Sequence, residues 1–288
     1  MNKIAILTGA TGGLGKAFLK ELLKEDIDQI WAVGRNKNKL DELCSKYGDK
    51  IFPVQCDLCD ESEVKKILAL IEEKKPNVKF LINNAGMAKM SKMINFTEDE
   101  ISKTIEINCK TPTIICQYVI PYMSKGSRIL NISSASSFQP NPYIALYSAT
   151  KVYLRSYSRS LNYELKEKGI TCTAVCPGWI DTEMLEKEQN GKKIKFPGLV
   201  SAEKVAKKAI KDAKKEKDMS VCTLFVKNEH ICSKFFPQKW IMNIWGKGVK
   251  KYVEDWNRTS RFIWCKYDDF NGSKGNRRVY TRWDSWSF

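Results

Sequence analysis

The alternation of short apolar runs with longer stretches of helical periodicity constrains the fold of this chain most strongly. It extends over residues 3–226. Apolar runs rich in β-branched residues predict strands, and the stretches between them predict helices that connect one parallel strand to the next. This alternation is typical of βαβ units. We therefore predict an α/β fold in which a doubly wound parallel sheet lies between two layers of helices, a three-layer α/β/α arrangement.

The boundaries of these elements follow from periodicity, caps and turn residues. The predicted strands are residues 3–8, 29–33, 51–55, 78–82, 128–132 and 170–175, with an edge strand at 221–226. The predicted helices are residues 16–24, 37–47, 62–73, 97–123, 147–168 and 201–217. Thr97 and Glu100 form a capping-box pattern at the start of the longest helix, and Pro112 predicts a bend within it.

A glycine-rich turn, T-G-A-T-G-G-L-G, follows the first predicted strand and precedes the first helix. Gly9, Gly13 and Gly15 leave bare backbone there, so that a pyrophosphate can approach the chain and meet the N-terminal end of the helix. Tight strand-to-helix connections also use glycine without binding a ligand. The position after the first strand nevertheless favours a dinucleotide cofactor and a Rossmann-type fold.

Arg35 follows the second predicted strand in A-V-G-R-N, where a dinucleotide fold meets the adenosine ribose. An acidic residue there would accept hydrogen bonds from both ribose hydroxyls, whereas an arginine pairs with a 2′-phosphate. The sequence has no acidic residue at this position. We therefore predict NADP(H) as the preferred cofactor. NAD(H) is the alternative if Arg35 is an ordinary solvated side chain at the start of a helix.

Tyr147 and Lys151 stand four residues apart, so on a helix their side chains would lie on one face, one turn apart. A free tyrosine has a pKa of about 10, and a neighbouring cation is one of the few ways to favour its phenolate near neutral pH. An ordinary aromatic residue and a solvated lysine would show the same spacing. The pair is therefore a candidate acid/base whose role depends on the remaining motifs.

Taken together and in order, the motifs resemble those of the short-chain dehydrogenase/reductase family. The matching positions are T-G-x-x-x-G-x-G at residues 8–15, Asp57 after the third strand, N-N-A-G at residues 83–86, Asn108 in the longest helix, Y-x-x-x-K at residues 147–151, and P-G followed by Thr182. The resemblance covers roughly residues 1–226. It implies an oxidoreductase that transfers a hydride between a nicotinamide and a carbonyl or alcohol carbon.

The resemblance implies four catalytic residues. Tyr147 would be the general acid/base, and Ser134 would hold the substrate oxygen. Lys151 would bond the nicotinamide ribose and lower the pKa of the phenol, and Asn108 would hold a water that links Lys151 to solvent. Further serines stand beside Ser134 in a serine-rich turn, and the spacing of thirteen residues to Tyr147 favours Ser134 among them.

The resemblance also implies a set of cofactor-binding residues at the carboxyl ends of the predicted strands. Asp57 would bond the adenine amino group, Asn83 would lie under the cofactor, and Thr182 would meet the carboxamide. The full implied set is Thr8, Gly9, Gly13, Leu14, Gly15, Arg35, Asp57, Leu58, Asn84, Ala85, Gly86, Tyr147, Lys151, Pro177, Gly178 and Thr182. No metal site is predicted, because the chain has one histidine and no pair of C-x-x-C motifs at zinc spacing.

Apolar and aromatic residues surround the predicted reaction site in the sequence. Phe138 and Tyr143 precede the tyrosine, and Trp179 and Met184 follow the P-G turn. They predict a hydrophobic ketone or aldehyde as substrate, since binding pockets for such compounds are lined by residues of this kind. The alternative is that several of them only pack the long loop at residues 178–200.

The chain changes character after residue 236. Residues 237–253 place tryptophan and isoleucine at helical spacing among lysines, which predicts a basic amphipathic helix. It could lie on an anionic membrane, but packing over the substrate loop or against another subunit is favoured. Residues 254–288 interleave four tryptophans with basic residues. An arm that wraps the body or a partner subunit is favoured there over nucleic-acid binding.

Length and composition complete the prediction. The 288 residues fit one dinucleotide-binding catalytic domain, residues 1–236, with substrate loop 178–200, and a basic aromatic extension, residues 237–288. The sequence contains no run of 18 or more apolar residues, so no membrane span is predicted. Ten cysteines without a secretion signal predict free thiols and a cytoplasmic protein.

We therefore expect an NADP(H)-dependent carbonyl reductase or alcohol dehydrogenase. The family resemblance implies a homodimer or homotetramer built through the two long helices, residues 97–123 and 147–168. The alternative function is an NADP(H)-binding regulatory or scaffold protein that uses its basic aromatic tail to contact a partner or a membrane. Intact Ser134, Tyr147 and Lys151 argue against this alternative.

Overall fold

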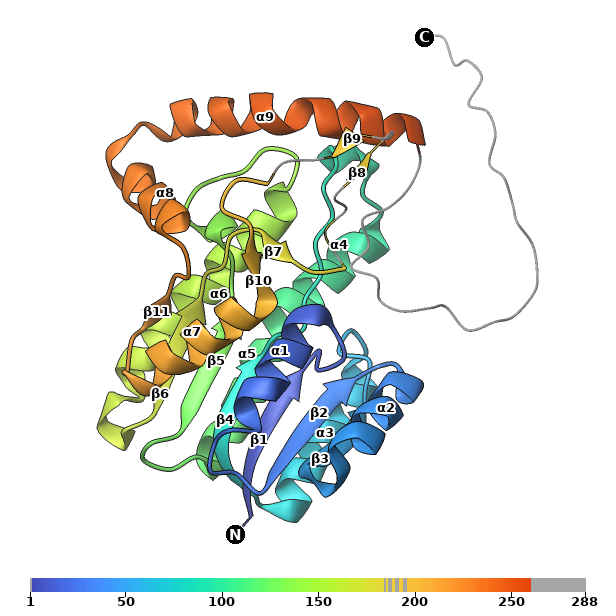
Figure 1. Cartoon of the computed structure of the whole chain (residues 1–288), viewed down its shortest axis with the longest axis vertical. Coiled ribbons are helices and arrows are strands. Elements are labelled where there is room, and N and C mark those ends of the chain that lie inside the picture. The colour runs from blue at the N-terminus through green and yellow to red at the C-terminus, as the bar shows by residue number, and fades with distance from the viewer. Residues whose placement is uncertain (1, 184, 186–187, 190–191, 194–195, 260–288) are drawn as a thin grey trace, which may run out of the picture.

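A seven-stranded parallel sheet forms the centre of the protein (Figure 1). The structure is a computed structural model that describes residues 2–183, 185, 188–189, 192–193 and 196–259. The strands are β1 (Lys3–Thr8), β2 (Gln29–Gly34), β3 (Ile51–Gln55), β4 (Asn77–Asn83), β5 (Arg128–Ile132), β6 (Thr171–Val175) and β11 (Met219–Ser220). Their order in the sheet is β11-β6-β5-β4-β1-β2-β3. The order reverses beside β1, as in a doubly wound Rossmann-type fold.

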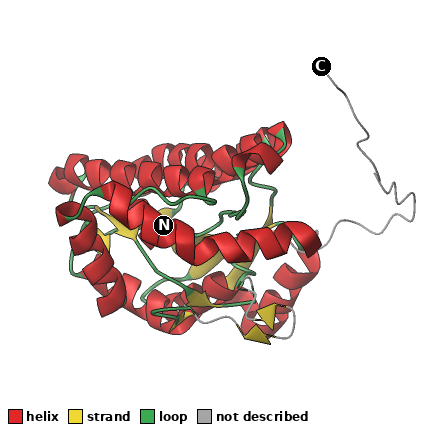
Figure 2. Ribbon diagram, turned by 90° about the horizontal axis from the view of Figure 1, so that it is seen from above, coloured by secondary structure: helices red, strands yellow, loops and turns green. Residues whose placement is uncertain are grey.

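Helices cover both faces of the sheet, as the view from above shows (Figure 2). They are α1 (Gly13–Leu22), α2 (Lys37–Tyr47), α3 (Glu61–Lys74), α4 (Glu98–Ile105), α5 (Thr111–Val119), α6 (Ala145–Glu164), α7 (Ala202–Lys214), α8 (Leu224–Phe235) and α9 (Gln238–Thr259). Two small pairs complete the fold, β7 (Ile180–Asp181) with β10 (Val200–Ser201), and β8 (Glu188–Gln189) with β9 (Lys192–Lys193). The predicted three-layer α/β fold is confirmed.

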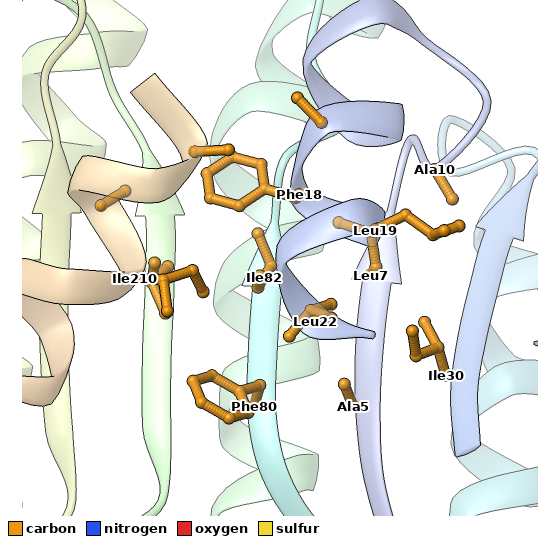
Figure 3. Close-up of a cluster of buried hydrophobic side chains, with 14 of the residues drawn as sticks. Ala5, Leu7, Ala10, Phe18, Leu19, Leu22, Ile30, Phe80, Ile82 and Ile210 are labelled. Atoms are coloured by element: carbon orange, nitrogen blue, oxygen red, sulfur yellow. The ribbon is translucent and has the colours of Figure 1, made fainter. Parts of the chain in front are cut away.

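The protein has two hydrophobic cores, one on each face of the sheet. Successive side chains of a strand point to opposite faces. Ala5 and Leu7 of β1 therefore pack in the cluster under α1, α2 and α7, whereas Ile4 and Ile6 pack in the cluster under α3 and α5. Figure 3 shows Phe18, Leu19 and Leu22 of α1 and Ile210 of α7 over the first of these clusters. Such burial on both faces is the reason the parallel strands read as continuous apolar runs.

The predicted helix 97–123 is divided in the structure. The capping box is present, since the Thr97 hydroxyl accepts from the Glu100 backbone N–H and the Glu100 carboxylate accepts from the Thr97 N–H. A π-helical turn, Glu106–Lys110, then separates α4 from α5, and Pro112 lies in the first turn of α5. Proline is tolerated there because the first N–H groups of a helix have no intrahelical partner. The prediction of one long helix missed this turn, which contains Asn108.

The predicted edge strand at 221–226 is wrong. The edge strand β11 ends at Ser220, and α8 begins at Leu224. Thr223 caps that helix, because its hydroxyl accepts from the backbone N–H of Val226 at 3.2 Å. The composition of this segment favours a strand, but the hydrogen bond to Thr223 starts a helix there instead. None of the helices among the described residues has the length and apolar character needed to cross a bilayer.

Asp212 ties α7 to the edge strand. Its carboxylate is buried and accepts from the Ser220 hydroxyl of β11 at 2.8 Å, and it pairs with Lys208 and with Lys217, the latter at 3.0 Å. Burial alone would raise the pKa of Asp212. The hydrogen bonds from Lys208, Ser220 and Lys217 outweigh it, so the pKa lies below its ordinary value of 3.8.

Replacing Asp212 with asparagine is expected to lower the free energy of unfolding by about 2 kcal/mol at neutral pH, because charged hydrogen bonds to a buried group are lost. A carboxyl whose pKa is lowered by folding contributes stability above its unfolded pKa and loses it as the pH falls through the folded pKa. Denaturant unfolding should therefore show the difference between the wild type and Asp212→Asn shrinking below about pH 4. A difference that is constant down to acid pH would contradict the assignment.

Candidate active site

A cavity of about 410 Å³ lies at the carboxyl ends of the strands. The glycine turn after β1, the residues after β2 and β4, the serine-rich turn after β5, the first turns of α6 and the P-G turn after β6 all contribute to its wall. Predicted cofactor residues on this wall are Gly9, Gly13, Leu14, Gly15, Arg35, Leu58, Asn84, Ala85, Gly86, Tyr147, Lys151, Pro177, Gly178 and Thr182. Segments distant in sequence therefore meet at one site, as expected where a doubly wound sheet binds its ligand.

The glycine turn has no room for a side chain at Gly9 or Gly15. Gly9 has a φ of +64°, and a Cβ on it would lie 2.9 Å from Nδ2 of Asn84. A Cβ on Gly15 would lie 2.0 Å from the carbonyl oxygen of Gly9, which lets α1 start directly against the turn. Bare backbone and the N-terminal end of α1 thus face the cavity. This arrangement fits the pyrophosphate of a dinucleotide.

Thr8 and Asn84 fasten the glycine turn to the end of β4. The Thr8 hydroxyl accepts from the backbone N–H groups of Asn84 and Ala85, each at 3.0 Å. The Asn84 amide donates to the carbonyls of Thr8 and Gly9, each at 3.1 Å. Thr8 is buried and is not among the residues that line the cavity. Its position therefore fits a positioning residue rather than a direct cofactor contact.

Asn83, which was expected to lie under the cofactor, is not among the residues that line the cavity. It is buried, and its amide donates to Oδ1 of Asn131 at 2.8 Å, which links β4 to β5 within the sheet. Successive residues of a strand point to opposite faces. Of the two asparagines in N-N-A-G, only Asn84 belongs to the cavity wall.

Charged residues mark the end of the cavity near β2. Arg35 and Lys39 both line it. Lys39 lies in α2 and was not part of the A-V-G-R-N motif from which Arg35 was predicted. Nη1 of Arg35 lies 3.7 Å from Oδ2 of Asp57. Asp57 is not among the lining residues, and its Oδ1 accepts from the backbone N–H of Cys59 at 3.0 Å. This end of the cavity therefore has two cationic side chains on its lining and one carboxylate beside Arg35.

Tyr147 and Lys151 lie on consecutive turns at the start of α6, as the spacing predicts. Nζ of Lys151 lies 5.5 Å from the centre of the Tyr147 ring and donates to the carbonyl oxygen of Ile132 at 2.8 Å. Lys151 is only 4% exposed. The ammonium is thus held between the helix and the end of β5, beside the phenol and within the cavity wall.

The serines of the turn after β5 have different environments. The Ser133 hydroxyl donates to the backbone carbonyl of Lys151 at 2.7 Å, and that of Ser137 donates to the carbonyl of Ser134. Ser134 lines the cavity, and its Oγ accepts from the backbone N–H of Ser136 at 3.1 Å. Its own O–H can therefore donate to a ligand while Oγ is held in place. The preference for Ser134 over Ser133 agrees with this geometry.

Asn108 is buried in the π-helical turn behind the site. Its amide donates to the carbonyl of Met87 at 2.9 Å and to Oγ1 of Thr150 at 3.0 Å, and its Oδ1 accepts from the Met87 N–H at 2.9 Å. A Cβ on Gly86 would lie 2.9 Å from Oδ1 of Asn108 and 3.3 Å from Nζ of Lys151. Asn108 and Lys151 therefore converge on Gly86, although Asn108 is not among the lining residues.

Aromatic side chains form the other end of the cavity. Trp179 lines it and stacks on Trp245 of α9 with ring centres 6.2 Å apart and an interplanar angle of 9°. Nε1 of Trp245 donates to the carbonyl of Pro142 at 2.9 Å. The C-terminal helix thus packs over the substrate loop, the favoured interpretation of residues 237–253, and it continues through Gly246 and Gly248.

The other predicted substrate residues lie elsewhere. Phe138 is buried with its ring centre 4.2 Å from that of His230 and is not among the lining residues. Tyr143 has a φ of +69°, and its carbonyl accepts from the Ser91 N–H, while its side chain also is not on the lining. Met184 lies outside the described residues. Trp179, predicted from its position after the P-G turn, is therefore on the cavity wall, whereas Phe138 and Tyr143, predicted from their proximity to Tyr147 in the sequence, are not.

Several lining residues were missed by the sequence analysis. Phe225 and Glu229 come from α8, only the first three residues of which lay in the predicted strand 221–226, and Trp245 comes from the C-terminal helix. Burial raises the pKa of the Glu229 carboxyl. The tryptophan spacing after residue 237 was a signal for Trp245, but nothing in the sequence placed α8 over the cavity. Within the described residues, no cluster of three or more His, Cys, Asp or Glu side chains could hold a metal ion.

Comparisons with known proteins agree with this geometry. A short chain dehydrogenase family model matches residues 3–193. An uncharacterized oxidoreductase of Staphylococcus epidermidis is 30% identical over 196 residues, which cover 67% of this chain and 85% of the relative. Among solved structures, a 4-hydroxyisoleucine dehydrogenase complexed with NADH has 26% identity and a TM-score of 0.58, with 64% of this chain and 76% of that chain covered.

A second solved structure contains the phosphorylated cofactor. The closed form of a serine dehydrogenase complexed with NADP+ has 28% identity and a TM-score of 0.58, with 62% of this chain and 74% of that chain covered. The family match, the sheet order and the cavity at the strand ends all lead to one assignment. The chain belongs to the short-chain dehydrogenase/reductase family and is an NAD(P)-dependent oxidoreductase that acts on alcohols.

Proposed function

We propose that the protein is an NADP(H)-dependent carbonyl reductase that interconverts a hydrophobic ketone or aldehyde and its alcohol. The observation that carries the proposal is the buried Lys151 ammonium beside the Tyr147 ring, with Ser134 on the same cavity wall. Such a cluster can hold a carbonyl oxygen and deliver a proton to it. A scaffold protein would have no need for this arrangement, which favours the enzyme over the alternative function.

The bound nicotinamide supplies the hydride that reaches the carbonyl carbon. The protein supplies the proton and the orientation. The Tyr147 phenol donates its proton to the substrate oxygen, and the Ser134 O–H donates a hydrogen bond to the same oxygen. The positive charge of Lys151 stabilises the phenolate that results. In the oxidative direction the same phenolate accepts the alcohol proton.

The proton that Tyr147 gives up must be replaced, and we assign the path to Lys151 and the backbone at Asn108. The side-chain amide of Asn108 is already bonded to Met87 and Thr150, so it fixes the turn rather than holding a mobile water. Pro112 has no N–H, so the α-helical hydrogen bond to the Asn108 carbonyl four residues earlier cannot form. We propose that this carbonyl holds a water between Lys151 and solvent. Asn108 acts here as a positioning residue.

The preference for NADP(H) rests on Arg35 and Lys39. Both line the end of the cavity where a 2′-phosphate would lie, and an arginine and a lysine can each bond a phosphate. Asp57 partly offsets the Arg35 charge at 3.7 Å. NAD(H) remains the alternative cofactor, since similar solved structures contain NADP+ in one case and NADH in another.

Replacing Arg35 with aspartate is expected to reverse the preference. The carboxylate would repel a 2′-phosphate and accept hydrogen bonds from a ribose 2′-hydroxyl. We expect kcat/KM for NADPH to fall about 100-fold relative to NADH, since roughly 2 to 3 kcal/mol of charged hydrogen bonding is lost. Lys37→Asp, which makes the same charge change two residues later at the start of α2 but is not on the cavity lining, is the matched control. An unchanged NADPH/NADH ratio in Arg35→Asp would refute the role of Arg35.

The hydrophobic substrate class rests on the aromatic end of the cavity. Trp179, Trp245 and Phe225 line it, together with Ile180 and Leu185. Apolar surface removed from water would bind the carbonyl compound, while Ser134 and Tyr147 orient its oxygen. Glu229 is a carboxyl on this wall and can accept a hydrogen bond from a hydroxyl or amino group on the substrate.

We further propose a homodimer or homotetramer and a cytoplasmic location. The helices expected at the subunit interface expose large apolar side chains, namely Ile105 on α4, Tyr118 on α5, and Val152 and Tyr153 on α6. Burial of such residues favours association. The cysteines in the described part of the chain are free thiols, which a reducing compartment maintains.

A further inference from the structure

Helices α8 and α9 expose large apolar side chains that no part of the described structure covers. Phe235 is 79% exposed, Ile244 is 75% exposed, and Trp240 is 62% exposed. We call the outer faces of the two helices the α8–α9 surface. Its apolar members are Leu224, Ile231, Phe235, Phe236, Trp240 and Ile244. A concentration of this kind on a protein surface indicates an interaction site.

The division of α9 into two faces is sharp. Ile241, Trp245 and Val249 follow one another at i, i+4 and i+8 and are half-buried or buried, as are the neighbouring Met242 and Gly246. Trp240 and Ile244 follow one another at the same spacing on the exposed side. The inner face therefore accounts for the packing of α9 over the substrate loop. This packing does not explain the apolar side chains on the outer face.

The charge of this segment is almost entirely positive. Residues 224–250 contain five lysines and one acidic residue, Glu229. Glu229 is half-buried and lines the cavity, so it does little to neutralise the outside. Lys227 and Lys234 of α8, and Lys239 and Lys247 of α9, are all exposed. The α8–α9 surface thus combines apolar and basic side chains without exposed carboxylates in residues 224–250.

The surface also adjoins the aromatic end of the cavity. Figure 1 shows α9 lying across the end of the molecule beyond the carboxyl ends of the strands, with α8 beside it. Phe225 of α8 and Trp245 of α9 line the cavity itself. A partner bound to the outer faces of these helices would therefore lie next to the entrance for an apolar substrate.

We propose that the α8–α9 surface binds the face of a lipid bilayer that contains anionic phospholipids. Tryptophan and phenylalanine suit the boundary between headgroups and acyl chains, and lysines suit the negative charge of the headgroups. Each basic residue near such a surface adds to the attraction, which salt weakens. The protein would lie on the bilayer with its cavity opening towards it.

A second copy of the chain fits this surface less well. A symmetric dimer through α8 and α9 would bring the lysines of one copy against the same lysines of the other, with no exposed carboxylate of this segment to compensate. Like charges brought together across an interface oppose association. A phospholipid surface instead supplies negative charge and an apolar interior together.

Vesicle flotation tests the proposal with the full-length protein, in the absence of cofactor and substrate. The vesicles are phosphatidylcholine alone or phosphatidylcholine with phosphatidylglycerol, at low and at high salt. The proposal expects binding to the anionic vesicles at low salt, with weak binding to neutral vesicles and a loss at high salt. The measurement does not depend on the proposed reaction, so a failure of either leaves the other standing.

Two double variants locate the binding surface. Trp240→Ser with Ile244→Ser removes apolar area that is exposed, and Lys234→Glu with Lys239→Glu reverses charge. Each is expected to weaken partitioning into anionic vesicles at least about tenfold. Circular dichroism and unchanged turnover of a water-soluble carbonyl check that the fold is intact, since none of the four residues lines the cavity.

Matched controls come from the opposite end of the sheet, where α6 ends and the chain enters β6. Tyr163 is 81% exposed there, and Lys166 and Lys168 follow it. Tyr163→Ser, and Lys166→Glu with Lys168→Glu, should leave vesicle binding unchanged. Equal binding to neutral and anionic vesicles, or undiminished binding by both double variants of the α8–α9 surface, would overturn the proposal. The proposal would also be overturned if the wild type did not bind vesicles and sedimentation velocity showed that it is a dimer, whereas the Trp240/Ile244 variant is a monomer.

Discussion

Replacing Tyr147 with phenylalanine is expected to lower kcat about 10³-fold while NADPH binding stays within a factor of two or so, since general acid/base groups contribute about 10² to 10⁴ in rate. The ring lies beside Lys151 at the start of α6, and the change removes only the hydroxyl that delivers the proton. Packing of the ring is retained. Stopped-flow hydride transfer and fluorescence titration with NADPH measure the two quantities separately.

Tyr153→Phe is the matched control for this experiment. Tyr153 lies on the same helix, but its hydroxyl is 3.0 Å from Oγ1 of Thr113 and it is not on the cavity lining. We expect its kcat to match that of the wild type. Turnover by Tyr147→Phe at the wild-type rate, with cofactor bound, would show that another group donates the proton.

The second large effect is expected from Lys151→Met. Methionine has a similar length but carries no charge and no donor, so the hydrogen bond to the Ile132 carbonyl and the positive charge beside Tyr147 are both lost. We expect kcat/KM to fall about 10³-fold and NADPH binding to weaken about tenfold, since Lys151 is proposed to act on both the phenol and the ribose. In the oxidative direction the rate should recover partly as the pH rises, because the phenolate that accepts the alcohol proton then forms without the ammonium.

The buried position of Lys151 requires a check on folding. The Ile132 carbonyl loses a partner, which costs about 1 to 3 kcal/mol if no water replaces it. Thermal unfolding measures this loss, and Lys16→Met on the exposed side of α1 is the control for the substitution itself. A Lys151→Met enzyme with normal kcat/KM, or one that binds NADPH normally and has an unchanged pH profile, would contradict the double role.

The sheet and the glycine turn could be predicted from the sequence because their causes are local. Strands buried on both faces read as apolar runs, and a turn that excludes side chains must use glycine, as Gly9 and Gly15 show. The Tyr147–Lys151 spacing likewise needs only one helix to become a contact. These features depend on a few neighbouring residues, so they can be predicted without knowing how the rest of the chain folds.

The features that were missed depend on contacts between distant segments. The region at 221–226 has the composition of a strand, but Thr223 caps a helix there, and that helix brings Phe225 and Glu229 to the cavity. Phe138 lies near Tyr147 in the sequence, yet it packs against His230 of the same helix α8. The placement of α8 thus decides which aromatic residues reach the substrate. Periodicity contains no information about it.

The cofactor residues show the same limit at finer scale. Thr8 and Asp57 are not on the cavity lining but contact residues that are, Thr8 with Asn84 and Asp57 with Arg35, and their contact with the cofactor stays a prediction. The π-helical turn at Asn108 is likewise invisible to a pattern of helical period. A motif marks where a site lies. The side-chain partners of each residue depend on the neighbouring strands.

The central claim is that this site transfers a hydride from NADPH to an apolar carbonyl while Tyr147 supplies the proton. Deuterium transfer from NADPH labelled at nicotinamide C4, offered with a panel of aryl and alicyclic ketones, tests it most directly. Mass spectrometry of the product should show one deuterium on the carbinol carbon with the wild type, and a rate about 10³-fold lower with Tyr147→Phe. Equal rates for the two proteins, or transfer from labelled NADH but not from labelled NADPH, would contradict it.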